Sequence, residues 1–483
     1  MLFNTIEYIL FLPCIAFFYF LLPHRFRWIL LLAGSYFFYM CWNPKYALLM
    51  LTSTLITYAS GILIAGARMP GRKKLWVALS FSSNLLILTF FKYFNFLSGS
   101  LQSLFSMASV SVSIPTLDIL LPVGISFYTF QALSYTMDVY RGDLKPTRHL
   151  GKYALFVSFF PQLVAGPIER SSNLLAQFDE EHVFDYERAK DGFVLILFGM
   201  FKKIMIADRL SILVNTVYND CTSYNGPAYI LATIFFAFQI YCDFSGYSDI
   251  AIGSAEIMGF RLMKNFDRPY FSQSIGEFWR RWHISLSTWF RDYLYIPLGG
   301  SRCSAARWAF NIMVVFLVSG LWHGANWTFV IWGCLHGIYQ VIGKALRPAK
   351  NRLYQAIGLN TGGKLYAAGS AVCTFILVDF AWIFFRANSV QDAFGIILGL
   401  FRFEGGWTFG TLGMQKPDLL FSLFVIAGLV LLEMLQKYFG SRAWIQKRSL
   451  PVRWGIYLLF LFSMILFGKY GSLTESSFIY FQF

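Results

Sequence analysis

About twelve apolar segments, separated by more polar connections, follow one another from residue 7 to residue 470. An α-helix needs roughly 20 apolar residues to cross the hydrocarbon core of a bilayer. Only helices and closed barrels satisfy every backbone polar group at that depth. The chain is also 57% hydrophobic and 13% charged, more apolar than a water-soluble domain could cover. These features predict an all-α polytopic membrane protein.

The spans are expected between the charged loops, with ends uncertain by several residues. They are residues 7–23, 28–42, 46–67, 75–95, 119–137, 191–214, 227–258, 308–322, 325–343, 365–385, 417–437 and 454–470. Several are shorter than the roughly 20 residues a spanning helix needs. We therefore expect about 11–12 transmembrane helices, with re-entrant and interfacial helices beside them. No internal repeat or low-complexity linker is visible, so residues 1–483 are predicted to form a single membrane domain.

The formal net charge of +15 is unevenly distributed along the chain. Basic residues gather in alternate loops, a pattern that marks the cytoplasmic side of membrane proteins rather than a nucleic-acid surface. These loops are residues 24–27, 68–74, 141–152, 261–307, 344–352 and 437–453. The alternation predicts that both termini are extracytoplasmic.

Seven cysteines are scattered along the chain, mostly inside apolar segments. They form no CxxC pair and no metal-ligand spacing, so neither a disulfide framework nor a metal site is expected. The first ten residues contain no Lys or Arg. We therefore expect the first apolar segment to be retained as a span rather than cleaved as a signal peptide.

His323 lies in residues 319–327, between two apolar segments that can enter a bilayer. A charged side chain at that depth is unfavourable by a few kcal/mol, but a neutral imidazole avoids most of this penalty and can still accept a proton. Acyl transfer from a thioester to a hydroxyl requires such a base. The alternative is a core histidine bonded to a backbone carbonyl. Trp322 and Asn326, in the same stretch, are candidate substrate-binding residues.

Residues 278–295 are too charged to span a membrane but rich in Trp and Arg, which is typical of the membrane interface. Read as one helix, the segment places His283, Ser287 and Arg291 on one stripe. We expect this stripe to be a wall that binds a phosphate-bearing donor such as coenzyme A, because arginine pairs bidentately with phosphate. The candidate substrate-binding residues are Arg280, Arg281, Trp282, Ser287 and Arg291. The alternative is a plain amphipathic anchor.

Asp243 and Asp249 lie inside the apolar span 227–258. Carboxylates at such depth are usually paired or line a polar cavity. They could orient a histidine or bind a positive group, and Asp249 is a candidate substrate-binding residue on that basis. Equally, they could be structural partners of Arg280 or Arg281.

Pro and Gly interrupt the apolar runs at residues 122–131 and 159–170. Such breaks occur where protein or a cavity satisfies the freed backbone groups. His336 and Asp379 are expected to be buried hydrogen-bonding residues. The remaining histidines, in predicted loops, are expected to be solvated; they are His24, His149 and His182. Since the chain has no Gly-x-Ser-x-Gly elbow and no Walker loop, a base-catalysed direct transfer is the simplest expectation.

Taken together, these motifs resemble the membrane-bound O-acyltransferase superfamily, and within it the bacterial branch that contains the alginate O-acetyltransferase membrane subunit. The matching segments are residues 121–131, 158–170, 241–253, 265–300 and 319–327, so the motif-bearing core covers 120–340. The resemblance implies a helical bundle around a central funnel, with His323 as the family histidine. His283 stands where eukaryotic relatives usually carry Asn. It is therefore expected to be a second catalytic group or a donor-binding one.

The resemblance further implies an O-acyltransferase of the bacterial cytoplasmic (inner) membrane. Its members take acetyl from a cytoplasmic donor, here expected to be acetyl-CoA, and hold no bound cofactor. The acetyl passes across the membrane toward an extracytoplasmic acetyltransferase partner, which acetylates a polysaccharide such as alginate. Three alternatives stay open: D-alanyl transfer to teichoic acid from a carrier protein, another acceptor such as peptidoglycan, and a non-catalytic transporter. The transporter is disfavoured because the chain lacks duplicated halves.

Overall fold

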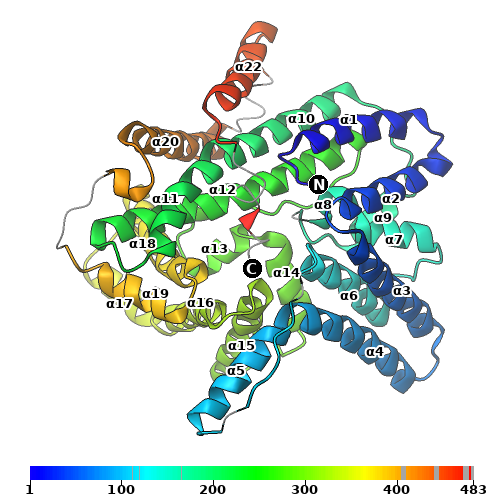
Figure 1. Ribbon diagram of the computed structural model, residues 1–483, viewed down its shortest axis with the longest axis horizontal. Helices are drawn as coiled ribbons and strands as arrows, with labels where there is room; N and C mark the ends of the chain where they lie inside the picture. Colours follow the sequence, from blue (N-terminus) through cyan, green and yellow to red (C-terminus); the bar gives the residue numbers. More distant parts are fainter. Residues whose placement is uncertain are drawn as a thin grey trace. The chain divides into compact units, whose positions relative to one another are not determined.

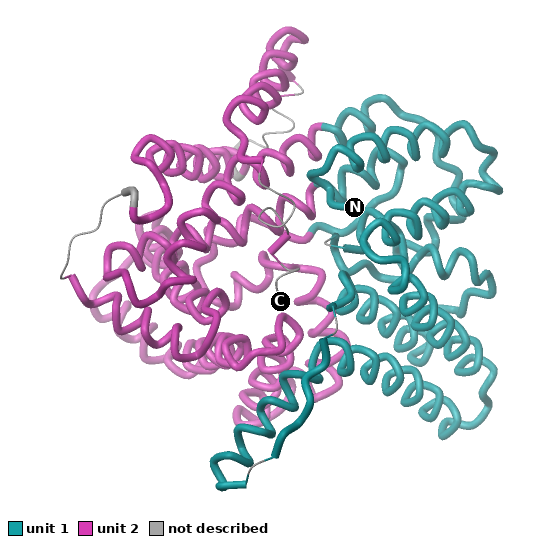
Figure 2. Tube along the Cα trace, in the orientation of Figure 1, with its two compact units in different colours: residues 1–193, 250–264 teal, residues 194–249, 265–483 magenta. Residues whose placement is uncertain are grey.

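The computed structural model describes residues 1–110, 112–118, 120–164, 166–403, 409–439, 445, 447–470 and 478–479. Every regular element in these ranges is helical, which confirms the predicted all-α class. Two compact units share the chain: unit 1 comprises residues 1–193 and 250–264, and unit 2 comprises residues 194–249 and 265–483 (Figure 2). The single membrane domain over residues 1–483 stays a prediction.

Figure 1 labels the helices. Those that begin in unit 1 are α1 (Ile6–Leu21), α2 (His24–Met40), α3 (Pro44–Gly66), α4 (Pro70–Leu88), η1 (Thr89–Tyr93), α5 (Phe94–Met107), α6 (Ile125–Arg141), α7 (Leu150–Ser158), α8 (Phe160–Leu163), α9 (Ser171–Gln177) and α10 (Tyr186–Met200). Those that begin in unit 2 are η2 (Phe201–Ala207), α11 (Asp208–Asn219), α12 (Gly226–Met258), η3 (Pro269–Phe271), α13 (Ile275–Arg281), α14 (Ile284–Phe290), η4 (Arg291–Tyr295), α15 (Ala305–His323), α16 (Trp327–Ala345), α17 (Arg347–Ala356), α18 (Lys364–Arg386), α19 (Val390–Gly399), η5 (Phe409–Leu412), α20 (Lys416–Phe439) and α22 (Leu450–Phe467). Two helices, α10 and α12, pass from one unit into the other.

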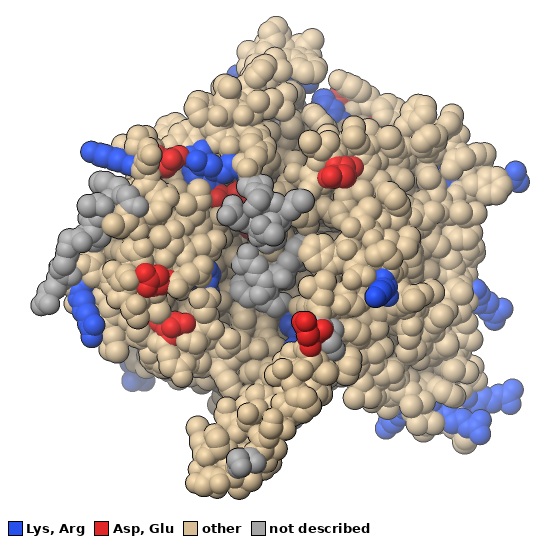
Figure 3. Space-filling model, in the orientation of Figure 1, with Lys and Arg blue, Asp and Glu red and all other residues tan. Residues whose placement is uncertain are grey.

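Seven helices within the described residues are long and apolar enough to cross a membrane, or eight if the bent pair α16 and α17 is one span. This confirms a polytopic membrane protein. Large apolar side chains cover much of the exposed surface, and charged atoms are scattered in the view of Figure 3. The stretch between the expected spans 75–95 and 119–137 is helical in part, because α4, η1 and α5 run continuously and residues 98–107 are helical.

Side chains from the two Pro- and Gly-containing breaks in unit 1 make hydrogen bonds to the backbone of α7. The amide of Gln131 in α6 donates to the carbonyl oxygen of Phe156 at 2.5 Å. The amide of Gln162 in α8 donates to the same oxygen at 2.9 Å. Two side-chain donors therefore serve one backbone acceptor near the end of α7.

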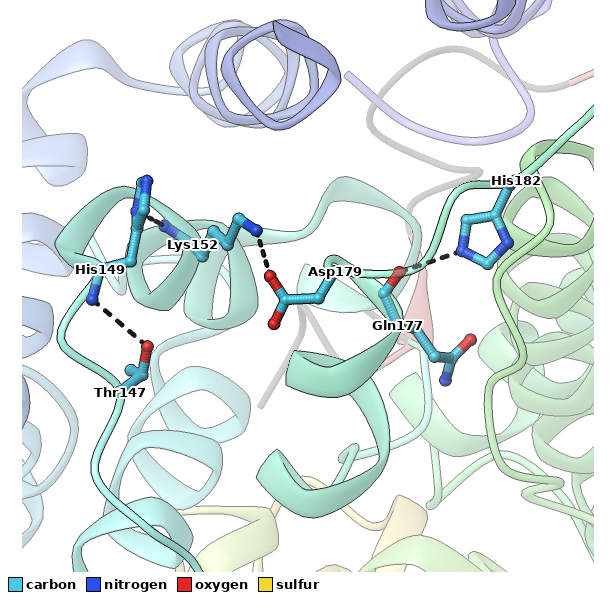
Figure 4. Close-up of polar contacts among 6 residues, drawn as sticks. All are labelled: Thr147, His149, Lys152, Gln177, Asp179 and His182. Atoms are coloured by element: carbon cyan, nitrogen blue, oxygen red, sulfur yellow. Dashed lines mark hydrogen bonds and ion pairs between the residues drawn. The ribbon is translucent and has the colours of Figure 1, made fainter. Parts of the chain in front are cut away.

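Figure 4 shows polar contacts of two histidines near α7 and α9, both of which the sequence predicted to be solvated. The structure shows that they differ in burial. His149 is exposed, and its Nδ1 accepts the backbone N–H of Lys152 at 3.1 Å, capping α7. The Lys152 ammonium pairs with Asp179. His182, by contrast, is buried: its Nε2 lies 3.0 Å from the carbonyl oxygen of Gln177. The prediction for His182 is wrong because its ring packs on Phe260, which lies far away in sequence.

In unit 2, glycines let α15 and α16 pack closely, and His323 is the last residue of α15. A Cβ on Gly320 would lie 2.3 Å from the carbonyl oxygen of Phe329, and one on Gly333 would lie 2.2 Å from that of Phe316. Helices in membranes approach this closely where small residues face one another. The hairpin therefore fixes where the end of α15, and with it His323, is placed.

Candidate active site

The segment that holds His283 is broken, which corrects the prediction of one continuous helix over residues 278–295. Helix α13 ends at Arg281, α14 begins at Ile284, and η4 follows as a π-helix. His283 itself has a φ of 43°, in the left-handed region. His283 therefore precedes the helix as its N-cap, and the prediction that His283, Ser287 and Arg291 form one helical stripe at four-residue spacing is wrong.

His283 is fully buried rather than exposed at a membrane interface. Its Nδ1 lies 3.0 Å from Oδ1 of Asn265, and the Ser285 hydroxyl donates to the same Oδ1 at 2.9 Å. Its ring packs edge-on against Phe244, with centroids 4.6 Å apart. Because burial disfavours the charged imidazolium, it lowers the pKa of His283 to about 3. The imidazole is therefore neutral at physiological pH.

His323 is also buried, and the structure brings it next to His283. The centroids of the two imidazole rings lie 6.5 Å apart. Trp322 contacts both histidines, at centroid distances of 5.8 Å from His283 and 5.0 Å from His323. Helix α15 and the break between α13 and α14 therefore supply two imidazoles and an indole to one buried site.

Aromatic rings from α16 and α18 complete the surroundings of His323. Trp332 and Phe385 pack edge-on against it, with centroids 5.0 Å and 5.3 Å away. His336, farther along α16, accepts a hydrogen bond at Nδ1 from the indole N–H of Trp279 at 3.2 Å. His336 is thus the buried hydrogen-bonding residue that the sequence predicts. An apolar aromatic environment of this kind favours neutral imidazoles and strengthens any hydrogen bond made inside it.

The candidate donor-binding arginines and Ser287 are exposed or bonded to groups other than the two histidines. Arg280 is exposed. Arg281 pairs with Glu277 at 2.6 Å, and Arg291 is exposed beside Asp292 at 2.7 Å. Ser287 is half-buried and donates weakly to the Trp282 carbonyl at 3.3 Å. Trp282, in contrast, is fully buried among other rings.

The two carboxylates of α12, of which Asp243 is buried and Asp249 half-buried, pair with lysines of η2, not with Arg280 or Arg281. Asp249 pairs with Lys202 at 2.5 Å, and Asp243 pairs with Lys203 at 2.9 Å. The alternative that these aspartates are structural partners of basic residues is therefore right in kind, but the partners are lysines of η2 rather than Arg280 or Arg281. The π-helical turn carries both lysines, and such turns are frequent at functional sites.

Asn326 forms the N-cap of α16. Its Oδ1 accepts the backbone N–H of Thr328 at 3.1 Å, and its amide donates to the carbonyl oxygen of Asn388 at 3.3 Å. A side chain that caps a helix satisfies a backbone donor that the helix itself leaves open. Its role in binding substrate remains a prediction.

Three residues of this region were not singled out from the sequence: Asn265, Lys202 and Lys203. Lysines inside the expected span 191–214 could have been read as partners for the intramembrane carboxylates, because such charges usually pair. For Asn265 the local sequence offers no comparable indication, since asparagine is common in loops for many reasons.

The chain is similar to several known membrane proteins. The model of the membrane-bound O-acyltransferase family matches residues 147–385, which include both histidines. The chain is 41% identical over 427 residues to the probable alginate O-acetylase AlgI of Azotobacter vinelandii, covering 86% of this chain and 82% of that protein. It is 35% identical over 401 residues to the peptidoglycan O-acetyltransferase of Helicobacter pylori, covering 78% and 74%. It is 31% identical over 232 residues to the teichoic acid D-alanyltransferase of Bacillus subtilis, covering 45% and 57%.

Proposed function

The chain belongs to the membrane-bound O-acyltransferase family and is a membrane O-acyltransferase, and we propose that it transfers acetyl from cytoplasmic acetyl-CoA for O-acetylation of an extracytoplasmic polysaccharide such as alginate. The observation that carries the proposal is the pairing of His323 with His283 in one buried aromatic site. Neutral imidazoles in such a site suit transfer between a thioester and a hydroxyl, because they can move a proton without a permanent buried charge.

In the proposed reaction His323 is the general base. It takes the proton of the acceptor hydroxyl while the hydroxyl oxygen bonds to the thioester carbonyl carbon. The carbon–sulfur bond then breaks, and the proton passes from the imidazolium to the departing thiolate. Positioned proton transfer of this kind contributes about a hundredfold to ten-thousandfold in rate. His283 lies close enough to His323 to act on the same reacting groups.

The donor is proposed to bind where the arginines of the α13–η4 segment meet solvent. Arg280 and Arg291 are exposed, so their guanidinium groups are accessible to phosphates of coenzyme A. Guanidinium groups bind phosphate in bidentate geometry. Asp292 competes with phosphate for Arg291, and the other arginines of the segment offset this competition. Asp249, Trp322 and Asn326 are proposed to contact the substrates from the other elements of unit 2.

Acetyl is favoured over D-alanyl by similarity. The relatives named as acetylases or acetyltransferases match 78% or more of this chain, whereas the D-alanyltransferase of Bacillus subtilis matches 45% of it. An extracytoplasmic partner that delivers acetyl to the polymer is part of the proposal, as is placement in the bacterial inner membrane with both termini outside the cytoplasm.

The test is acetyl-CoA turnover by the purified protein in nanodiscs, with and without a candidate extracytoplasmic acetyltransferase. We expect His323→Ala to abolish turnover while the thermal unfolding of the variant stays close to that of the wild type. His149→Ala, which changes an exposed histidine, is the matched control and keeps full turnover. Folded wild-type protein that ignores acetyl-CoA but responds to an acylated carrier protein would overturn the proposed donor.

A further inference from the structure

Asn265 lies at the centre of the hydrogen bonds that surround His283. It is buried, and its Oδ1 is contacted by three donors or potential donors of unit 2. These are His283 Nδ1 at 3.0 Å, the Ser285 hydroxyl at 2.9 Å and the Ser285 backbone N–H at 3.3 Å. On its other side, the Asn265 amide donates to Oγ of Ser248 in α12 at 3.1 Å.

These contacts fix which way the amide of Asn265 faces. A backbone N–H only donates, so the atom that the Ser285 N–H contacts is an oxygen. An amide oxygen only accepts, so His283 Nδ1 carries the hydrogen in this bond. In a neutral imidazole with hydrogen on Nδ1, Nε2 is the acceptor. Asn265 thus determines the tautomer of His283, and Ser248 holds Asn265 in the required orientation.

We propose that Asn265 is a positioning residue for the acyl transfer, which holds His283 as the neutral tautomer whose Nε2 can accept a proton beside His323. The inference rests on the proposed function, because it assigns His283 to the reaction. Asn265 acts through His283 and need not contact either substrate. A wrong tautomer would present an N–H where an acceptor is needed, a change that disables catalytic histidines elsewhere.

The backbone around Asn265 shows why this position can carry such a role. Its carbonyl oxygen accepts the backbone N–H of Ile284 at 2.9 Å, and the Asp267 N–H donates to the carbonyl oxygen of Arg281 at 2.9 Å. Two backbone bonds therefore clamp the segment after α12 onto the break between α13 and α14. The same two backbone hydrogen bonds hold His283 in its left-handed conformation and place the Asn265 side chain within hydrogen-bond distance of it.

The experiment compares Asn265→Leu with Asn265→Asp in the full-length protein in nanodiscs. Leucine removes the acceptor, and we expect turnover per folded molecule to fall about a hundredfold or more. Aspartate keeps the acceptor but adds a negative charge that favours the imidazolium, so the pKa of His283 rises by about one to three units. In Asn265→Asp the acid limb of the pH–rate profile therefore shifts to higher pH. Much of the maximal rate is recovered at high pH, where His283 is again neutral.

A buried asparagine elsewhere in unit 2 provides the matched control. Asn311 is buried in α15 and its amide donates to the carbonyl oxygen of Gly300 at 3.1 Å. Asn311→Leu should lower stability without lowering the turnover of the molecules that remain folded. If Asn265→Leu behaves in the same way, Asn265 is only structural and the inference fails. It also fails if Asn265→Asp loses as much activity as Asn265→Leu with no displacement of the pH profile.

A second readout needs no substrate. The chain has six histidines, so ¹⁵N-histidine NMR gives few imidazole signals, and His283→Ala identifies the one to follow. We expect hydrogen on Nδ1 of His283 in the wild type and a mixture of tautomers in Asn265→Leu. An unchanged His283 tautomer in Asn265→Leu overturns the inference, whatever turnover rate that variant shows. Lack of acyl transfer by the folded wild type overturns the proposed function instead, so the two failures are distinguishable.

Discussion

Replacing Lys203 with methionine tests how much the buried charge cluster of unit 2 stabilises the protein. The Lys203 ammonium lies 2.7 Å from Asp208 and 2.9 Å from Asp243, and the three side chains are 2%, 9% and 3% exposed. Methionine keeps most of the stem but leaves two buried carboxylates without their cation. Removing one partner of a buried ion pair costs about 3–5 kcal/mol. Protonation of one carboxyl limits the loss, so we expect a value within that range rather than above it.

The neighbouring lysine cannot easily replace the missing charge. Lys202 is already bonded to Asp249 at 2.5 Å and to the Ser245 hydroxyl at 3.1 Å. A fair comparison is Lys152→Met, because Lys152 pairs with Asp179, whose side chain is 69% exposed. Exposed pairs of this kind contribute about 1 kcal/mol or less. The difference between the two lysines therefore measures burial rather than the loss of a lysine as such.

The assay is reversible unfolding in mixed detergent micelles, followed by tryptophan fluorescence. The decisive variant combines Lys203→Met with Asp208→Asn and Asp243→Asn. Because it removes all three charges together, we expect it to recover most of the stability lost in Lys203→Met. A loss below about 1 kcal/mol in Lys203→Met, the value typical of exposed pairs, would refute the reasoning, as would a triple variant no more stable than the single one.

Two further predictions concern packing and pH. In α16, Gly333→Ala forces a Cβ to within 2.2 Å of the Phe316 carbonyl oxygen, so α15 and α16 must separate; we expect a loss of about 1–3 kcal/mol in the same unfolding assay. Gly343→Ala on the same helix is the control, because nothing lies within 4 Å of its added Cβ, and it should be neutral or stabilising. Burial lowers the pKa of His283 from its ordinary value of 6.5 to about 3 in the folded protein. The unfolded chain therefore binds the extra proton, and stability falls as pH drops from the unfolded pKa toward the folded one. At pH 5 this amounts to about 2 kcal/mol; His283→Gln should flatten the decline, whereas a decline as steep as that of the wild type would contradict the assignment, and the exposed His149→Gln should leave it unchanged.

The helices were predictable where hydrophobicity alone decides the structure. Long apolar runs became α3, α12, α15, α18 and α20 with ends within several residues of those predicted. Residues 98–107 were not recognised as helical, because serines and a glycine interrupt the apolar pattern there. Tertiary context often overrides such weak local preferences. In this stretch the helix simply continues from α4 through η1.

The site was predictable only in part. Depth in an apolar stretch was enough to single out His323. The Trp- and Arg-rich pattern of residues 278–295 singled out His283, and the resemblance added its expected catalytic or donor-binding role. The break at Trp282 and His283 was missed because residues 278–295 have the periodicity of an amphipathic helix and contain no Gly or Pro before Ile296. The contacts that hold the break come from Asn265, 18 residues before His283 in sequence, and a periodic pattern contains no information about such a partner.

The energy of that break explains why the partner matters. A left-handed backbone at a residue other than glycine costs of order 1–3 kcal/mol and persists only where surrounding contacts enforce it. At His283 the Asn265 carbonyl accepts the N–H of Ile284, and the Asn265 side chain accepts from His283 and Ser285. Each such bond contributes about 0.5–1.5 kcal/mol net. Together they offset the strain, so one asparagine both bends the chain at His283 and sets the hydrogen on its ring.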